Sequence, residues 1–351
     1  MAGPRLLATG TKEWQQRADS LPISEVVKLY EDGFAGCVYE PDERDEFQRR
    51  ATSEFGTFKG GDLATANGWA ESGAGKLVIP FVFILKYFPG CLPGAAQARG
   101  DCVSHNEKNA CLLTLACDIA SGKPDQETGH VEAPPEIPPA GVSEGALSTE
   151  WIYWHRGYNG DGWSCDASAN VVLKHGLLVR KPYPDLGIDL TTYSGSLAGK
   201  FGSRQPPAEM QAVGDDHLVR GAVEISSFEE IRDFLNNGYG VGACGGEGWS
   251  SQRDANGFSK RSGRWSHAMS VIGADDRDVI KQAYGGPLIL IQNSWGRFNS
   301  GGRRILGTTV DIPEGSFWAL WSDCKSRYHV AHSSVNGWPS KKLPPFYSPL
   351  G

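Results

Sequence analysis

The chain has 351 residues, with 34 lysines and arginines against 41 aspartates and glutamates, so its formal net charge is −7. An acidic chain of this kind lacks the electrostatic footprint of a nucleic-acid-binding protein. Hydrophobic residues make up 40% of the chain, near the globular average, while 45 glycines exceed the usual share of about 7%. These values predict a globular protein that is rich in loops.

The sequence predicts neither a membrane anchor nor a leader peptide. The longest apolar run, residues 77–85, is about half of a roughly 20-residue membrane span and contains Pro80. The apolar stretch at residues 6–8, after Arg5 and before Thr9, is too short for a signal-peptide core. We therefore expect a cytoplasmic protein in a reducing compartment, with no membrane partner.

The spacing of the cysteines indicates neither a disulfide framework nor a zinc site, because they are spread along the chain and no two of them form a Cys-x-x-Cys pair. Most are expected to be buried as small hydrophobic residues. They are Cys37, Cys91, Cys102, Cys111, Cys117, Cys165, Cys244 and Cys324.

The first quarter of the chain predicts two helices and a strand. Apolar residues recur at helical spacing over Pro22–Phe34, with Ser20 as the N-cap, and a charged helix is predicted over Pro41–Phe55. The apolar run Leu77–Tyr87 has the composition of a strand, in which Pro80 would stand at an edge or a bend.

The middle of the chain predicts three further helices. A largely buried helix is predicted over Cys102–Ala120, followed by a Pro-rich surface linker over Lys123–Ser143. Shorter helices are predicted over Asp166–His175 and Ser227–Leu235, because each is closed by a glycine at its C-terminal end. The glycine-rich stretch Gly238–Gly248 is interpreted as a turn beside a cleft, because it lacks the Gly-Lys-Ser/Thr ending of a phosphate-binding loop.

Strands are predicted mainly in the last third of the chain. This order, helices first and strands later, favours an α+β fold over alternating βαβ units. The predicted strands cover Met269–Ile272, Leu288–Ile291 and Phe317–Trp321.

Three short segments together indicate nucleophilic chemistry: 97–104, 265–269 and 292–296. A thiol becomes a good nucleophile when a helix N-terminus and an imidazolium favour its thiolate form, and Cys102 starts a predicted helix. The nucleophile also needs a base, and the base needs a third group that orients it. His267, just before a strand, and Asn293, just after one, suit these roles.

The motifs His267-Ala268 before an apolar strand and Asn293-Ser294-Trp295-Gly296 after another resemble those of the papain-like cysteine peptidases. The chain order of Cys, His and Asn is the same. The separations from Cys102 to His267 and Asn293 exceed the family's roughly 130–150 residues, and insertions in the Pro-rich linker and near residues 275–286 would account for the excess.

The resemblance implies a role for each residue of this set. Cys102 would be the nucleophile and His267 the base that Asn293 orients, while Trp295 would shield the His–Asn hydrogen bond from water. Gln97 would join the Cys102 backbone N–H in stabilising the oxyanion, at about 3 kcal/mol per donor. No metal and no cofactor are implied.

The resemblance also implies a substrate-binding surface, with a peptide or protein as the partner. Gly160 and Gly162 resemble the family's Asn-Gly-Gly turn, whose bare backbone pairs with an extended peptide. Ala268 and Trp295 would lie beside the bound substrate on the other side of the cleft.

The sequence departs from the family around the nucleophile. The family's Cys-Gly-Ser-Cys-Trp is replaced by 99–103, Arg-Gly-Asp-Cys-Val, and Gln97 stands five residues before Cys102 where the family has six. His105, one turn after Cys102, is not expected to be the base, because it points along the helix. His329 and His332 have a spacing that could bind metal, but a surface position is expected for both.

The expected organisation is a papain-like α+β domain at 90–325, with a helical lobe, an antiparallel β lobe and the cleft between them. Residues 1–89 form an N-terminal extension, with a permanent docking arm favoured over a removable propeptide, and 326–351 form a Pro-rich tail. The expected reaction is hydrolysis of peptide or isopeptide bonds through a thioester. Acyl transfer stays open. The alternative is a structural or interaction protein, such as a component of a virion or another assembly, that keeps the fold with little or no activity.

Overall fold

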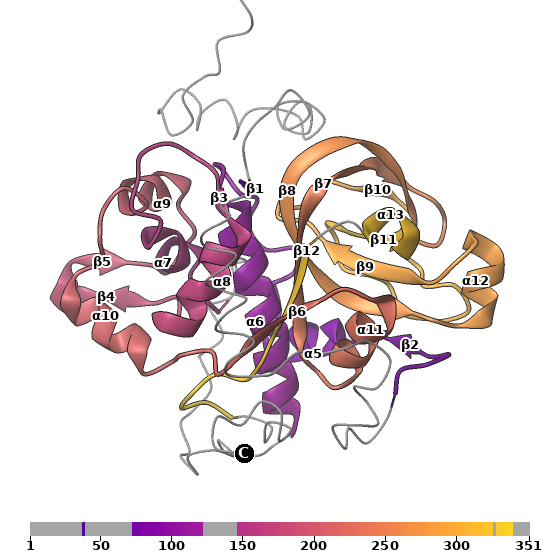
Figure 1. Ribbon diagram of the computed structural model, residues 1–351, viewed down its shortest axis with the longest axis horizontal. Helices are drawn as coiled ribbons and strands as arrows, with labels where there is room; N and C mark the ends of the chain where they lie inside the picture. The colour runs from indigo at the N-terminus through magenta and orange to yellow at the C-terminus, as the bar shows by residue number, and fades with distance from the viewer. Residues whose placement is uncertain (1–36, 39–71, 122–145, 326–327, 340–351) are drawn as a thin grey trace, which may run out of the picture.

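The computed structural model describes residues 37–38, 72–121, 146–325 and 328–339. Two lobes lie side by side, with the long helix α6 (Cys102–Ser121) between them (Figure 1). One lobe is mostly helical and the other is built on an eight-stranded, mainly antiparallel sheet. The predicted α+β fold, with a helical lobe and an antiparallel β lobe, is therefore confirmed.

The helical lobe holds short helices with little strand structure. Its strands β4 and β5 pair with each other, and β3 pairs with β1 (Cys37–Val38). Its elements are α7 (Thr149–Trp154), β3 (Trp163–Ser164), α8 (Cys165–Lys174), β4 (Pro182–Tyr183), the 3-10 turn η1 (Pro184–Leu186), β5 (Ile188–Asp189), α9 (Gly195–Phe201) and α10 (Ala208–Asp215).

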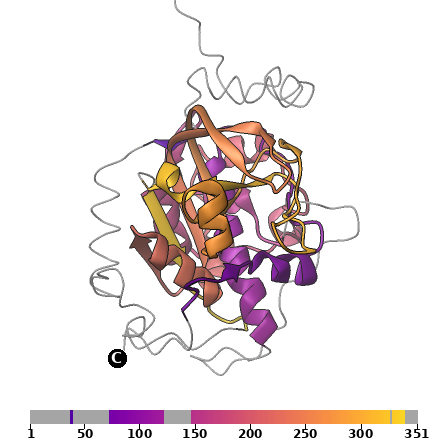
Figure 2. The same ribbon diagram turned by 90° about the vertical axis from the view of Figure 1, so that its right-hand side faces the viewer.

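The β lobe is organised around the paired strands β7 and β8, which bend over its top (Figures 1 and 2). The strand order is β11-β9-β8-β7-β12-β6, with β2 joined to β8 and β10 joined to β7. Its elements are β2 (Leu77–Val78), β6 (Ala222–Ile225), α11 (Phe228–Asn236), β7 (Gly240–Arg253), β8 (Ser259–Asp275), α12 (Asp278–Tyr284), β9 (Leu288–Gln292), β10 (Ser300–Gly301), β11 (Ser316–Leu320), α13 (Trp321–Cys324) and β12 (Tyr328–His332).

Helix α6 is the centre of the core, because it packs on β7 and β8 on one side and on α7 and α8 on the other. Its side chains are buried from Cys102 to Asp118. Strand β7 approaches it so closely that a Cβ atom at Gly240 would lie 2.0 Å from the carbonyl oxygen of Ala110. From Gly240 onward the predicted turn is thus wrong, because Gly240 and Gly242 lie in a strand that packs closely against α6.

The strand predicted over Leu77–Tyr87 is also wrong beyond its first residues. Only Leu77 and Val78 pair with β8, and the chain then enters helix α5 (Phe81–Tyr87). Pro80 precedes the helix, where its missing N–H costs nothing, and Phe81 and Ile84 bury one face against α6.

The remaining predicted elements of the described chain are confirmed. Helix α6 covers the helix predicted at Cys102–Ala120, and α8 and α11 begin after the capping residues Ser164 and Ser227. The three predicted strands lie in β8, β9 and β11, except that Trp321 begins α13. The helices predicted at 22–34 and 41–55 and the linker at 123–143 lie outside the described residues.

The segment predicted as a C-terminal tail contributes a strand to the sheet. Strand β12 lies between β7 and β6, so a boundary at residue 325 would cut the sheet. His329 and His332 lie on this strand and are each 1% exposed, and His332 forms an ion pair with Glu107 of α6. The surface position expected for the two histidines is therefore wrong.

Two cysteines form a disulfide that the sequence did not predict. Cys165 on α8 is bonded to Cys244 on β7, across a sequence separation of 79 residues. Only the packing of the two lobes on α6 brings such distant positions together. Disulfides persist in oxidising environments, so this bond does not fit the expected reducing compartment.

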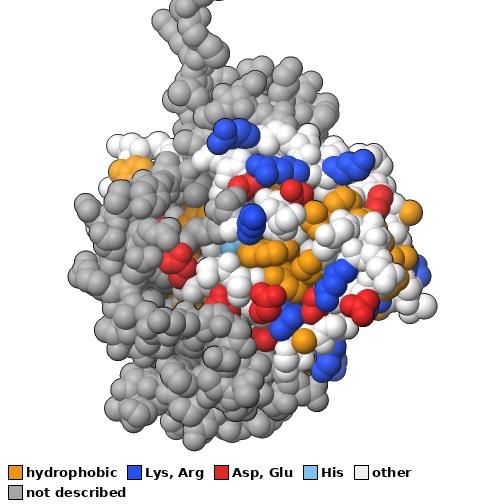
Figure 3. Space-filling model, turned by 45° about the vertical axis from the view of Figure 1, so that its right-hand side comes forward, with side chains coloured by type: hydrophobic (Ala, Val, Ile, Leu, Met, Phe, Trp, Pro, Cys, Tyr) orange, Lys and Arg blue, Asp and Glu red, His pale blue; other side chains and the backbone are white. Residues whose placement is uncertain are grey.

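The β-lobe face in Figure 3 has an apolar area in its middle, with Lys and Arg side chains gathered above it and acidic and basic side chains mixed below it. Among the helices that the structure describes, none has the length and apolar character needed to cross a membrane.

Candidate active site

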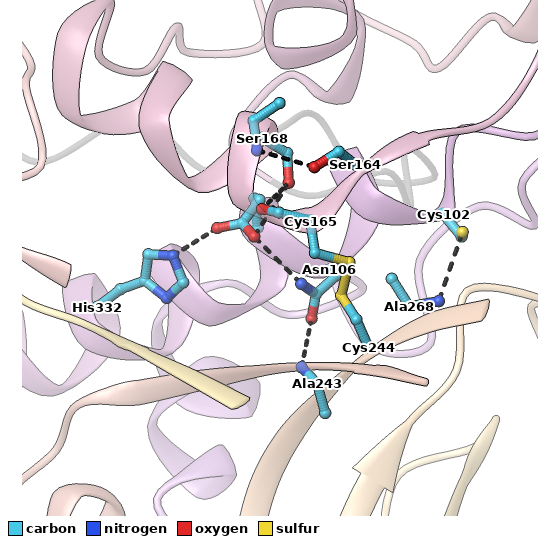
Figure 4. The surroundings of a disulfide bond; sticks show 11 residues. Cys102, Asn106, Ser164, Cys165, Ser168, Ala243, Cys244, Ala268 and His332 are labelled. Atoms are coloured by element: carbon cyan, nitrogen blue, oxygen red, sulfur yellow. Dashed lines mark hydrogen bonds and ion pairs between the residues drawn. A yellow bond between two sulfur atoms is a disulfide. The ribbon is translucent and has the colours of Figure 1, made fainter. Parts of the chain in front are cut away.

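Cys102 is the first residue of α6 and is fully buried. The preceding residue, Asp101, joins the start of the helix: its carbonyl accepts hydrogen bonds from the backbone N–H groups of Ser104 and His105, at 3.0 and 3.2 Å. The Ala268 backbone N–H donates to the Cys102 sulfur at 3.4 Å (Figure 4). The helix N-terminus and this N–H both favour negative charge on the sulfur.

His267 and Asn293 form a second buried pair beside this contact. His267 directly precedes Ala268 on β8, and its Nε2 lies 2.8 Å from the Asn293 Oδ1 just after β9. The Ser294 backbone N–H donates to the same oxygen at 2.7 Å and fixes it in place. Because an amide oxygen only accepts, the neutral His267 ring carries its proton on Nε2 and its lone pair on Nδ1, the atom needed for a base.

An aromatic cluster encloses the His–Asn hydrogen bond. The Trp295 ring stacks on His267, with 4.6 Å between centroids and 27° between planes, and Trp295 is 2% exposed. Trp265 packs against Trp295 at 4.8 Å, and Phe298 at 5.3 Å. Trp265 was not singled out from the sequence, although it stands two positions before His267 and so faces the same side of the strand.

Gln97 lies between the nucleophile loop and the loop of Asn293. Its backbone N–H donates to the Ser294 carbonyl at 2.7 Å, and its Oε1 accepts from the Ser294 hydroxyl. Its Nε2 donates to the Arg99 carbonyl at 2.7 Å. An amide nitrogen carries two hydrogens, and one Nε2 hydrogen of Gln97 is donated to the Arg99 carbonyl. The predicted oxyanion role would therefore require the second Nε2 hydrogen.

The Gly160–Gly162 turn packs against the nucleophile loop. The Gly162 backbone N–H donates to the Gly100 carbonyl at 2.9 Å, and Arg99 forms an ion pair with Asp161. Gly160 has φ +101° and is exposed, and a Cβ atom built there would meet nothing within 4 Å. The turn therefore stands next to Cys102, while its role in substrate binding stays a prediction.

The residue before the nucleophile is a buried carboxylic acid that the sequence did not single out for a role. Asp101 is fully buried, and its Oδ2 accepts from the Tyr193 hydroxyl at 2.9 Å, while His105 Nε2 lies 3.7 Å from its Oδ1. Burial raises the pKa of Asp101 to about 8, although nearby Arg99 opposes this. Burial also lowers the pKa of His105 well below its ordinary value. At neutral pH both groups are therefore mainly uncharged.

No metal-binding arrangement is found in the described part of the chain, where no three His, Cys, Asp or Glu side chains gather in a suitable group. The site consists of a thiol, an imidazole and an amide, with neighbouring backbone N–H groups. Such a set can attack an acyl carbon and move a proton.

Comparisons with known proteins give matches only among solved structures. No family model and no curated protein matches the chain. It is similar to xylellain, a cysteine protease from Xylella fastidiosa, at 15% identity and TM-score 0.43, covering 68% of this chain and 81% of that one. It is also similar to procathepsin B S9 from Trypanosoma congolense, at 10% identity and TM-score 0.48, covering 93% and 98%. A third match is the Amb a 11 cysteine protease of ragweed pollen in its proform, at 13% identity and TM-score 0.40, covering 95% and 96%.

Proposed function

We propose that this protein is a papain-like cysteine peptidase, which hydrolyses peptide or isopeptide bonds in a peptide or protein substrate. The observation that carries the proposal is one arrangement. The Cys102 sulfur lies 3.4 Å from the backbone nitrogen of Ala268, and the adjacent His267 is oriented by Asn293 at 2.8 Å.

In the first half of the reaction His267 Nδ1 takes the thiol proton of Cys102. The sulfur attacks the carbonyl carbon of the scissile bond, and the carbonyl oxygen becomes an oxyanion. The Cys102 backbone N–H belongs to the first turn of α6, at the helix end where N–H dipoles favour negative charge. It is suited to stabilise the oxyanion, together with the Gln97 amide.

The imidazolium then gives its proton to the leaving amine, the C–N bond breaks, and the acyl group remains on Cys102 as a thioester. In the second half His267 takes a proton from water, and the resulting hydroxide adds to the thioester carbonyl. The C–S bond then breaks, the carboxylic acid product leaves, and the Cys102 sulfur regains its proton from His267. The stacked Trp295 and the hydrogen bond to Asn293 hold the ring for both transfers.

An epoxysuccinyl peptide probe tests the proposal. Intact-mass spectrometry should find one adduct on the wild-type protein and none on Cys102→Ala or His267→Ala. The matched control is Cys111→Ala, because Cys111 lies on the same helix and burial raises the pKa of its thiol well above the ordinary value. This variant should react like wild type.

The absence of an adduct on a folded wild-type protein would contradict the proposal. That result would favour the alternative of a structural or interaction protein that keeps the fold without the chemistry. Since Cys102 and His267 are fully buried, the probe also reports whether a substrate-like molecule reaches the thiol.

A further inference from the structure

The disulfide between Cys165 and Cys244 joins the two lobes beside the candidate active site. Cys165 starts α8 in the helical lobe, and Cys244 lies in β7 of the β lobe; Figures 1 and 4 show α8 and β7 on opposite sides of α6. It is the one disulfide found within the described ranges. Both cysteines are buried, 5% and 6% exposed.

One end of the bond is connected to the strand that carries the base. Cys244 stands directly opposite Ala268 in the β7–β8 ladder, and the next residue, Gly245, stands opposite His267. The Ala268 N–H contacts the nucleophile sulfur. A shift of β7 relative to α8 would therefore move His267 and the Ala268 N–H.

The other end is connected to the loop that carries the nucleophile. Cys165 stands three residues after Gly162. The Gly162 N–H donates to the carbonyl of Gly100, which stands two residues before Cys102. Helix α6 contacts both sides as well: the Asn106 amide oxygen accepts from the Ala243 N–H at 3.2 Å on β7, and Glu107 accepts from Ser168 at 3.2 Å on α8.

We propose that the Cys165–Cys244 disulfide is a positioning element, which holds the nucleophile loop and the base strand in reactive geometry, so that its cleavage disables the site. The inference rests on the proposed peptidase function. In the cleavage step a small dithiol gives two electrons and two protons, so that the S–S bond becomes two thiols and the dithiol becomes a cyclic disulfide. Cys102 then loses reactivity although its own thiol is unchanged.

The test measures the rate at which iodoacetamide alkylates Cys102 at mildly acidic pH, by peptide mapping. The native protein is measured before and after reduction with dithiothreitol without denaturant, followed by removal of the reductant. Loss of the linked Cys165–Cys244 peptide confirms the reduction. Cys165→Ser/Cys244→Ser and the packing-preserving Cys165→Ala/Cys244→Val are measured in parallel, with Cys324→Ser as a control that leaves the bond intact.

Reduction should slow the alkylation of Cys102 by about tenfold to a hundredfold, since displacement of reacting groups by about 1 Å has effects of this size. Both double variants should be slow with or without dithiol, and Cys324→Ser should behave like the native protein. Near-ultraviolet circular dichroism from the buried tryptophans verifies that each sample is folded.

Two negative results have different meanings. If the native Cys102 is fast and stays fast after verified reduction, the positioning role is refuted while the peptidase function stands. If the native Cys102 is no faster than the other cysteines, the proposed function itself fails, and the positioning role fails with it.

Discussion

Asp101→Asn should be more stable than the wild-type protein at neutral pH. The difference in unfolding free energy between them should grow as the pH rises toward neutrality. The carboxyl group is fully buried and accepts a hydrogen bond from Tyr193, an environment in which burial raises its pKa to about 8. In the unfolded chain the same group has its ordinary pKa of 3.8. Asn has the shape of the protonated acid and does not titrate.

The magnitude follows from proton linkage. Between the two pKa values the folded state holds a proton that the unfolded state has lost, so the contribution of Asp101 to stability is full below the unfolded pKa. It is lost as the pH rises toward the folded pKa. The loss is about 1.4 kcal/mol per pH unit. The gap in unfolding free energy between Asp101→Asn and wild type should therefore grow by about 2.7 kcal/mol from about pH 5 to about pH 7.

The assay is urea unfolding of both proteins at a series of pH values. Taking the difference between them removes the contributions of His105 and every other group that titrates alike in both. A gap that stays constant over this range would refute the reasoning, because Asp101 would then be ionised in the folded protein, with Arg99 close enough to compensate the burial.

Three further variants test the packing of the site. Asn293→Ala should lower kcat about a hundredfold with KM little changed, because Asn293 is fully buried and its loss leaves His267 without its orienting hydrogen bond; equal kcat values would contradict the orienting role. Trp295→Ala should lower the unfolding free energy by about 3–5 kcal/mol in urea titrations, since its ring is buried against His267. Gly240→Ala should lower the melting temperature markedly, because the new methyl group would lie 2.0 Å from the Ala110 oxygen, and an unchanged midpoint would show that β7 does not need this close approach.

The parts of the fold that the sequence predicted are those with local signals. The long helix begins at Cys102, and the strand that precedes Asn293 lies where an apolar run placed it. The apolar run after His267 also lies in a strand, but β8 begins at Ser259 and includes His267. The expectations that Asn293 orients His267 and that Trp295 shields their hydrogen bond followed from the family resemblance and not from periodicity.

The errors have a common physical origin in tertiary contacts. In α5 the spacing of Phe81 and Ile84 was helical, but the many aromatic and β-branched residues favoured a strand until packing on α6 decided otherwise. The Cys165–Cys244 disulfide leaves no local trace, because it depends on how two lobes meet. Asp101 was overlooked for a related reason, since only burial distinguishes it from a solvated acid.

The central claim is that His267 activates Cys102, and the pH dependence of Cys102 alkylation by iodoacetamide tests it most directly. In the wild-type protein Cys102 should react at mildly acidic pH, well below the ordinary thiol pKa of about 8.5, and ahead of the other cysteines. His267→Ala should move its reaction to about pH 8 and above. If Cys102 reacts only in that alkaline range in the wild-type protein as well, together with the other cysteines, it is not an activated nucleophile and the proposed mechanism is wrong.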